Sequence, residues 1–185
     1  MRVRGLVVAF FALVSCTTTN AVAQEKGQTG LTMGYPATIG LIWHVSDTMA
    51  LRPELSFSRA SNELSSSTPP ATSSSTGTGE AVALSGLFYV RKWESVGAYF
   101  SPRYAYSHSS TSSQSVSGSN STNTSSTHSV TGSIGVQYSV NRRFGVFGEA
   151  GFGYTRQNSH SSLAVYDNKG NAWATRTAIG AILYF

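Results

Sequence analysis

Apolar side chains alternate with small or polar ones along most of this chain, and no other feature restricts its fold as strongly. The run over residues 144–155 is the clearest case. Its apolar set is Phe144, Val146, Ala150, Phe152 and Tyr154, and its opposing set is Gly145, Phe147, Glu149, Gly151, Gly153 and Thr155. Because successive side chains of a β-strand point to opposite faces, this period of two predicts strands with one apolar face.

The same alternation recurs through the chain, over residues 37–45, 51–58, 81–91, 96–107, 130–140 and 176–185. Each run is roughly 9–13 residues, which is the length that a tilted strand needs to cross the hydrocarbon core of a membrane. An apolar outer face with aromatic residues near its ends, opposite a small or polar face, is typical of transmembrane β-strands. The strands of a soluble antiparallel sheet also alternate apolar with polar side chains, but such a sheet does not need strands of this length.

The N-terminus has the features of an export signal. Arg2 and Arg4 precede an apolar stretch at residues 6–14, and Ala21-Val22-Ala23 forms a small-x-small cleavage site. We therefore predict a signal peptide at 1–23 and a single domain at 24–185. A competing interpretation is a lipobox at residues 13–16, which would leave a lipid-modified Cys16 at the new N-terminus. With cleavage after Ala23 the mature chain has no cysteine, which excludes thiol catalysis and cysteine-based metal sites.

The connections between the runs differ in length in a regular way. Short turns are predicted near 46–48, 92–94 and 141–143, and long polar segments near 60–80, 108–128 and 157–171. Short turns on one side and long loops on the other are typical of outer-membrane barrels. Counting back from Phe185 gives seven strands, so an eighth is needed at 28–35, with a tight turn at Tyr35-Pro36. The predicted fold class is all-β, an eight-stranded antiparallel up-and-down transmembrane β-barrel.

The Ser/Thr-rich segments 61–78 and 107–129 are expected to be flexible hydrophilic loops, because they hold too few apolar residues to form a core. A second interpretation makes them a surface for an extracellular ligand, although they contain few aromatic or charged side chains that would act as binding hot spots.

The segment 143–154 (RFGVFGEAGFGY), the ending 180–185 (GAILYF), the leader and the alternation resemble the OmpA/OmpX-like family of small outer-membrane β-barrel domains. The resemblance covers about residues 27–185. It implies a location in the bacterial outer membrane, with membrane lipid as a partner. It also implies that Phe185 is part of the signal by which the barrel-assembly machinery recognises the chain. The family includes anchors, adhesins, resistance factors and porin-like members, so it does not decide the activity.

Five charged residues lie on the polar faces of the predicted strands: Arg52, Glu54, Arg103, Glu149 and Arg176. An arginine facing lipid would cost roughly 2–4 kcal/mol near the midplane, so these residues are expected to point inward. An eight-stranded barrel is just wide enough for side chains to fill. We predict a charged network that plugs the interior, with Glu149 within salt-bridge distance of at least one arginine. The alternative is a narrow ion path.

Other chemistries find little support in the sequence. The net charge of +5 is scattered, and loss of Arg2 and Arg4 would reduce it to +3, so no nucleic-acid partner is expected. His44, His108 and His128 do not have metal-ligand spacing, and no cofactor is expected. His160 and Ser162 could suggest a lipid A deacylase, but Asp167 is the only carboxylate that follows.

The predicted function is a monomeric, non-enzymatic outer-membrane β-barrel protein with a structural or surface-interaction role. A small porin-like passive channel and a lipid A-modifying enzyme are the alternatives.

Overall fold

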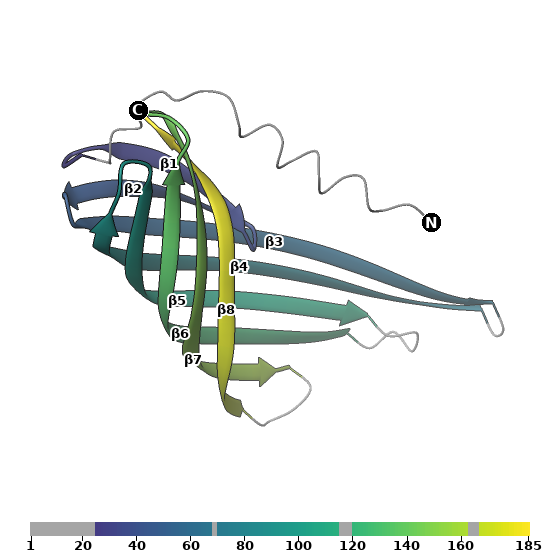
Figure 1. The fold of residues 1–185 in the computed structure, drawn as a ribbon. Helices are drawn as coiled ribbons and strands as arrows, with labels where there is room; N and C mark the ends of the chain where they lie inside the picture. Colours follow the sequence, from purple (N-terminus) through teal and green to yellow (C-terminus); the bar gives the residue numbers. More distant parts are fainter. Residues whose placement is uncertain (1–24, 68–69, 115–119, 163–166) are drawn as a thin grey trace, which may run out of the picture.

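The computed structural model describes residues 25–67, 70–114, 120–162 and 167–185. These residues form eight antiparallel strands in sequence order, and β1 pairs with β8 to close a barrel (Figure 1). The strands are β1 Thr29–Tyr35, β2 Thr38–Ser46, β3 Met49–Ser67, β4 Pro70–Lys92, β5 Val96–Gln114, β6 Asn120–Ser139, β7 Phe144–Ser161 and β8 Asn168–Tyr184. The predicted eight-stranded antiparallel up-and-down barrel is confirmed. The expected leader at 1–23, with Cys16, lies outside the described residues.

Closure of the barrel depends on the first strand, which the sequence predicted at 28–35 and the structure has at Thr29–Tyr35. Leu31 of β1 faces Leu41 of β2 on one side and Leu183 of β8 on the other. The connection to β2 is a tight turn after Tyr35, as expected. Closure leaves no unpaired sheet edge in this part of the barrel, which is the condition for burying strands in an apolar medium.

Short turns close one end of the barrel, which we call the turn end. They lie between Ser46 and Met49, between Lys92 and Val96, and between Ser139 and Phe144. In the last of these, the side-chain oxygen of Asn141 accepts hydrogen bonds from the backbone amides of Arg143 and Phe144, both at 2.8 Å. An asparagine that bonds its own following backbone in this way fixes a turn by local chemistry. The described residues include no helix long and apolar enough to span a bilayer.

The opposite end is not a set of loops. Strands β3 to β8 contain 17–23 residues, whereas β1 has 7 and β2 has 9, so six strands continue past the end of the first hairpin (Figure 1). We call this part the extension. The β3–β4 ladder is continuous to Ser67↔Pro70, and the β5–β6 ladder is continuous to Gln114↔Asn120.

The prediction of flexible loops at 61–78 and 107–129 was therefore wrong for the described residues of these segments. Their composition excludes a buried core, but a hairpin that grows out of an existing barrel does not need one. The strands of the closed barrel set the register of this hairpin, and its backbone groups pair across the ladder. Threonine also favours extended backbone.

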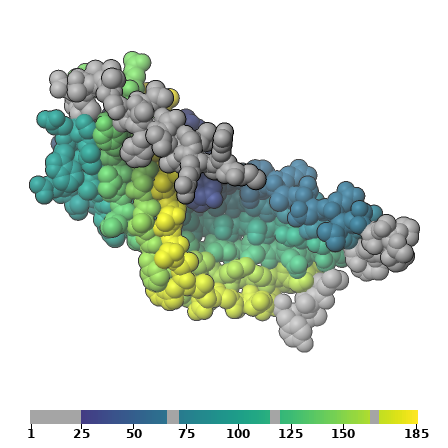
Figure 2. Space-filling view, turned by 45° about the vertical axis from the view of Figure 1, so that its right-hand side comes forward, coloured from purple at the N-terminus to yellow at the C-terminus, as the bar shows by residue number. Residues whose placement is uncertain are grey.

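The extension is an open sheet. The pairing of β2 with β3 reaches Leu55, and the pairing of β1 with β8 reaches Ile179. Beyond these positions β3 and β8 each have one neighbour, so their outer parts are sheet edges. Figure 2 shows the sheet curving into a trough between blue β3 and yellow β8.

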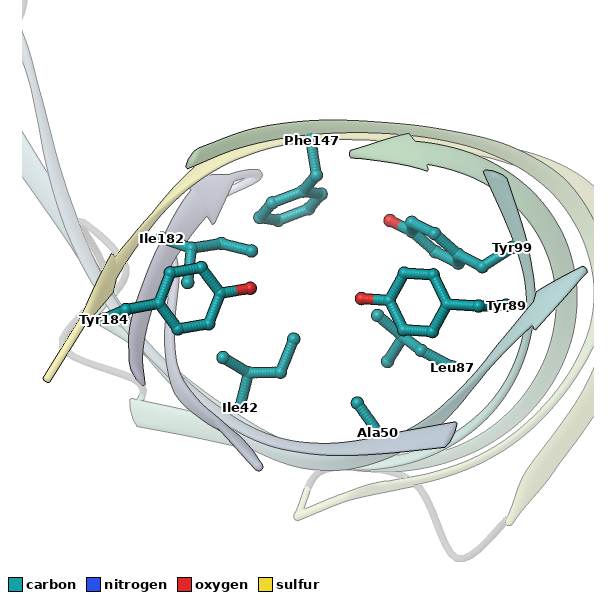
Figure 3. Close-up of a cluster of buried hydrophobic side chains, with 8 residues drawn as sticks. All are labelled: Ile42, Ala50, Leu87, Tyr89, Tyr99, Phe147, Ile182 and Tyr184. Atoms are coloured by element: carbon teal, nitrogen blue, oxygen red, sulfur yellow. The ribbon is translucent and has the colours of Figure 1, made fainter. Parts of the chain in front are cut away.

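The two faces of the barrel wall differ sharply. Ile42, Ala50, Leu87, Tyr89, Tyr99, Phe147, Ile182 and Tyr184 are buried in the interior, where Figure 3 shows them pointing to the barrel axis. Large apolar side chains also cover the outer face, among them Leu41, Trp43, Leu55, Phe57, Leu84, Ile134, Phe152, Trp173 and Ile179, each at least half exposed. The outer face is thus apolar and unburied in the isolated molecule.

Candidate functional site

The barrel interior is the candidate site, and its part nearest the turn end is a hydrogen-bonded aromatic layer. Tyr89 donates its hydroxyl to Gln137 Oε1 at 2.7 Å, and Gln137 Nε2 donates to the Tyr184 hydroxyl at 2.6 Å. His44 Nε2 lies 3.3 Å from the same Tyr184 oxygen. Figure 3 shows the Tyr89 and Tyr184 rings facing each other across the lumen. All four side chains are buried, and these hydrogen bonds link them across the interior. The other ring nitrogen of His44, Nδ1, is buried without a hydrogen-bond partner among the described residues.

Above this layer, Glu149 of β7 is surrounded by donors from three other strands. Arg52 of β3 reaches across the barrel and places Nη2 2.6 Å from Glu149 Oε1. The Tyr99 hydroxyl of β5 donates to the same oxygen at 2.9 Å. Arg176 of β8 donates from Nη1 to Oε2 at 2.8 Å. Both oxygens of this buried carboxylate are therefore held by charged donors, which is the condition under which a charge can remain buried.

Glu54, the second interior carboxylate, extends the network. Arg103 Nε donates to Glu54 Oε2 at 2.8 Å, and Arg52 Nε lies 3.4 Å from Glu54 Oε1. Arg52 thus contacts both carboxylates, and its guanidinium lies 4.7 Å from the centre of the Phe147 ring. Its side chain has no exposed surface, whereas those of Arg103 and Arg176 keep 13% and 18% of theirs.

The structure brings together all five charged residues that the sequence singled out. They form one chain of ion pairs in the order Arg103, Glu54, Arg52, Glu149 and Arg176. Glu149 meets two of its three candidate partners, and Arg103 pairs with Glu54 instead. Three arginines face two glutamates, so the network carries one excess positive charge. The two arginines with exposed surface lie at its extension side.

Glycines make room for the large side chains of this interior. A Cβ on Gly135 of β6 would lie 2.5 Å from the Tyr99 ring, and one on Gly180 of β8 would lie 2.6 Å from the Phe147 ring. Both distances are too short for any side chain at these positions. The two rings can therefore fold over the wall of the barrel and fill its lumen.

Sequence reasoning missed the aromatic layer, although two signals could have found it. Leu87 and Tyr89 interrupted the apolar outer face predicted for 81–91, and both are buried inside. The strand alternates regularly here, since Phe88 and Val90 are exposed on the outer face, so the pattern was blurred because both faces carry apolar residues. His44 stood on the polar face of its strand, as a buried interior residue should.

The remaining residues that the sequence singled out lie at the two ends of the barrel. Phe185 follows β8 at the turn end, with its side chain 76% exposed and its backbone amide bonded to Thr29 O at 3.1 Å. His160 Nδ1 lies 2.9 Å from Asp167 Oδ1, and both side chains are about two-thirds exposed, at 67% and 68%. Ser162 is not joined to His160 by any hydrogen bond between described residues, and its hydroxyl instead accepts from the Thr122 amide at 2.8 Å. Within the described residues no group of His, Cys, Asp and Glu is arranged to hold a metal ion.

No protein-family profile matches this chain, and no curated protein matches its sequence. Among solved structures, CarO of Acinetobacter baumannii aligns with a TM-score of 0.43 at 11% identity, over 86% of this chain and 98% of that one. Ail, the attachment invasion locus protein of Yersinia pestis, aligns with a TM-score of 0.44 at 12% identity, over 86% of this chain and 99% of that one. At this level of similarity the architecture rests on the strand pairing of the chain itself.

Proposed function

We propose that the chain is a non-enzymatic protein of the bacterial outer membrane, a barrel that spans the bilayer, has a plugged interior and presents its extension at the cell surface. The observation that carries this proposal is the outer face of the closed barrel. On β7 it runs from Phe144 to Tyr154 without a charged residue. Ten steps of about 3.3 Å, tilted by roughly 40°, cover about 25 Å, which is the height of the apolar band of outer-membrane barrels.

The rims of this band support the same conclusion. Trp43, Tyr138 and Phe144 lie on the outer face near the turn end, and Tyr104, Tyr154 and Trp173 lie near the extension. Aromatic side chains favour the two membrane–water interfaces, where their rings are partly hydrated. Short turns on one side and long projecting strands on the other support a topology with the turn end in the periplasm and the extension outside the cell.

The interior favours a plug over a passive channel. The following interior side chains are each buried to within 2% of their surface: Arg52, Tyr99, Ile42, Leu87, Ile182, His44 and Gln137. Two full layers of side chains, one aromatic and one charged, occupy the lumen. An open ion path would need hydrated side chains at these levels.

The extension supports a surface-interaction role, because six strands continue outward with side chains that hold no core. Its edges on β3 and β8 and its hydroxyl-rich faces are available to other molecules. A lipid A deacylase is not favoured, since Ser162 is bonded to backbone rather than to His160.

The test begins with the full chain expressed with its own leader in a Gram-negative host. It should fractionate with the outer membrane and migrate on gels as a heat-modifiable barrel. Recovery as a soluble periplasmic protein would refute the proposal. In planar bilayers the refolded protein should show no steady conductance, and regular open-channel steps would favour the porin-like alternative. Removal of acyl chains from lipid A, abolished by Ser162→Ala, would favour the enzyme.

A further inference from the structure

The outer face of the extension carries a cluster of basic side chains directly above the apolar band. At the rim of the band, Tyr104, Val130, Tyr154 and Trp173 face one another across β5 to β8. Two residues further out the same face carries Tyr106, His128, Arg156 and Asn171, and two further still it carries His108, Ser126, Asn158 and Lys169. The permanent charges of Arg156 and Lys169 therefore lie within four strand positions of the predicted membrane surface.

These two cations are diagonal neighbours on adjacent strands, since Arg156 faces Asn171 while Lys169 faces Asn158. Diagonal neighbours on one face are roughly 7–8 Å apart, so two such side chains can converge on one anion. Both are exposed, and neither forms a salt bridge with a described residue. The interior arginines Arg52, Arg103 and Arg176, by contrast, are all paired.

Lys169 of this pair lines a depression of about 240 Å³, together with residues that include His108, Ser126, Asn158 and Asp167. Its acidic member, Asp167, is already held by His160 at 2.9 Å. The side-chain oxygen of Asn158 is buried and has no hydrogen-bond partner among the described residues. A hydroxyl-bearing ligand that reached it after a small rotation of the side chain would satisfy it.

We propose that this basic cluster, defined by Arg156, Lys169 and Asn158, binds the phosphorylated headgroup of a glycolipid in the outer leaflet. The cluster borders the apolar band without a gap, so a molecule with acyl chains below and a phosphate above matches both surfaces at once. The phosphate would lie between Arg156 and Lys169, whose donors suit phosphate oxygens, and a sugar hydroxyl would reach Asn158. The inference rests on the proposed function, because only a membrane-spanning barrel brings the cluster to the headgroup level.

The test uses the full chain refolded in detergent micelles, with lipid binding measured by native mass spectrometry and by the shift in thermal unfolding. The probes are lipid A with two phosphates, the same lipid after dephosphorylation, and inorganic phosphate. The wild type should bind the phosphorylated lipid about tenfold more tightly than the dephosphorylated lipid, because charge-assisted contacts are lost in the latter. Millimolar inorganic phosphate should not displace the lipid.

The double variant Arg156→Gln/Lys169→Gln should lose this preference, and Lys169→Gln alone should lose part of it. The matched control is Arg142→Gln/Arg143→Gln, which removes the same two charges from an exposed turn at the opposite rim. The control should keep the full preference. Equal binding of the two lipids by the wild type, or an equal loss in both double variants, would overturn the inference. Displacement by inorganic phosphate would assign the cluster to a soluble anion and would overturn it as well.

Heat-modifiable migration of each variant is measured first. If the wild type does not form a membrane barrel, the proposed function fails. If the barrel forms but does not distinguish the lipids, the lipid site alone fails.

Discussion

Neutralising Glu149 is the most direct perturbation of the interior. The substitution Glu149→Gln keeps the size of the side chain and removes its charge. In the wild type this carboxylate accepts bonds from Arg52 at 2.6 Å, Tyr99 at 2.9 Å and Arg176 at 2.8 Å. After the change, three arginines would face the single carboxylate of Glu54, and Arg52 would remain fully buried with its contact to Glu54 at 3.4 Å.

Breaking a buried ion pair by removing one partner commonly costs about 3–5 kcal/mol, because the other charge is left without compensation. The lower end applies here, since the glutamine oxygen still accepts one hydrogen bond and Arg176 is partly screened by solvent. We expect a loss of about 3 kcal/mol in the free energy of unfolding. Arg176→Gln should cost less, about 1 kcal/mol, because its side chain is 18% exposed and its partner keeps Arg52 and Tyr99.

The assay is urea unfolding of the refolded barrel in detergent micelles, followed by tryptophan fluorescence and by heat-modifiable migration on gels. The matched control is Glu63→Gln, which removes the same charge from an exposed position on β3 in the extension. The control should change stability by less than about 0.5 kcal/mol. Equal effects of Glu149→Gln and Glu63→Gln would show that the interior network does not stabilise the barrel, and the plug interpretation would be abandoned.

Three further predictions concern packing, topology and assembly. Gly135→Ala should lower the free energy of unfolding by about 1–3 kcal/mol, because its Cβ would lie 2.5 Å from the Tyr99 ring, whereas Gly148→Ala, with nothing within 4 Å, should be close to neutral in the same urea titration. Protease added to intact cells should cut at the extension end and leave the turns at 47–48, 93–95 and 140–143 intact, as read by mass spectrometry of the fragments; the reverse pattern would invert the topology. Deletion of Phe185 should slow membrane assembly in pulse-chase experiments without a large change in the unfolding of the assembled barrel, since the side chain is 76% exposed; an unchanged assembly rate would exclude it as an assembly signal.

Alternation was enough to predict seven of the eight strands, their order and the direction in which most side chains point. The reason is that a period of two assigns every residue of a strand to one face once a single residue is assigned. Arg52, Glu54, Arg103, Glu149 and Arg176 all fell on the small or polar side, so their inward placement followed directly. The tight first turn after Tyr35 followed from the need to bring the number of strands to eight.

The pairing within the network could not be predicted in the same way. Arg52 and Glu149 lie 97 residues apart on β3 and β7, which are not neighbours in the sheet. Their contact depends on the barrel diameter and on how far an arginine reaches across it. The partner of Glu149 on the adjacent β8 depends on the β7–β8 register, which the intervening loop leaves open in the sequence. Alternation specifies the face of a residue but not its level along the axis.

The error at the extension has a different origin, because the alternation of the strands continues beyond the closed barrel. At inward positions of β5 and β6 in the extension the side chains are Ala105, Ser107, Ser109, Thr111, Ser113, Ser121, Asn123, Ser125, Thr127 and Ser129. On the outward side of the same strands lie Tyr106, His108 and His128. Both faces of the extension are exposed to water, so the difference in hydropathy between successive residues is small. The segment therefore resembles a loop in the sequence.

The asymmetry between the two faces nevertheless persists, because the aromatic and histidine side chains of β5 and β6 in the extension lie on the outer side alone. A random hydrophilic loop would place such groups on both sides. Their restriction to the outer face, next to the rim of the apolar band, is what the strand register produces. It is also why the basic cluster at Arg156 and Lys169 can lie at the level of lipid headgroups rather than in the trough.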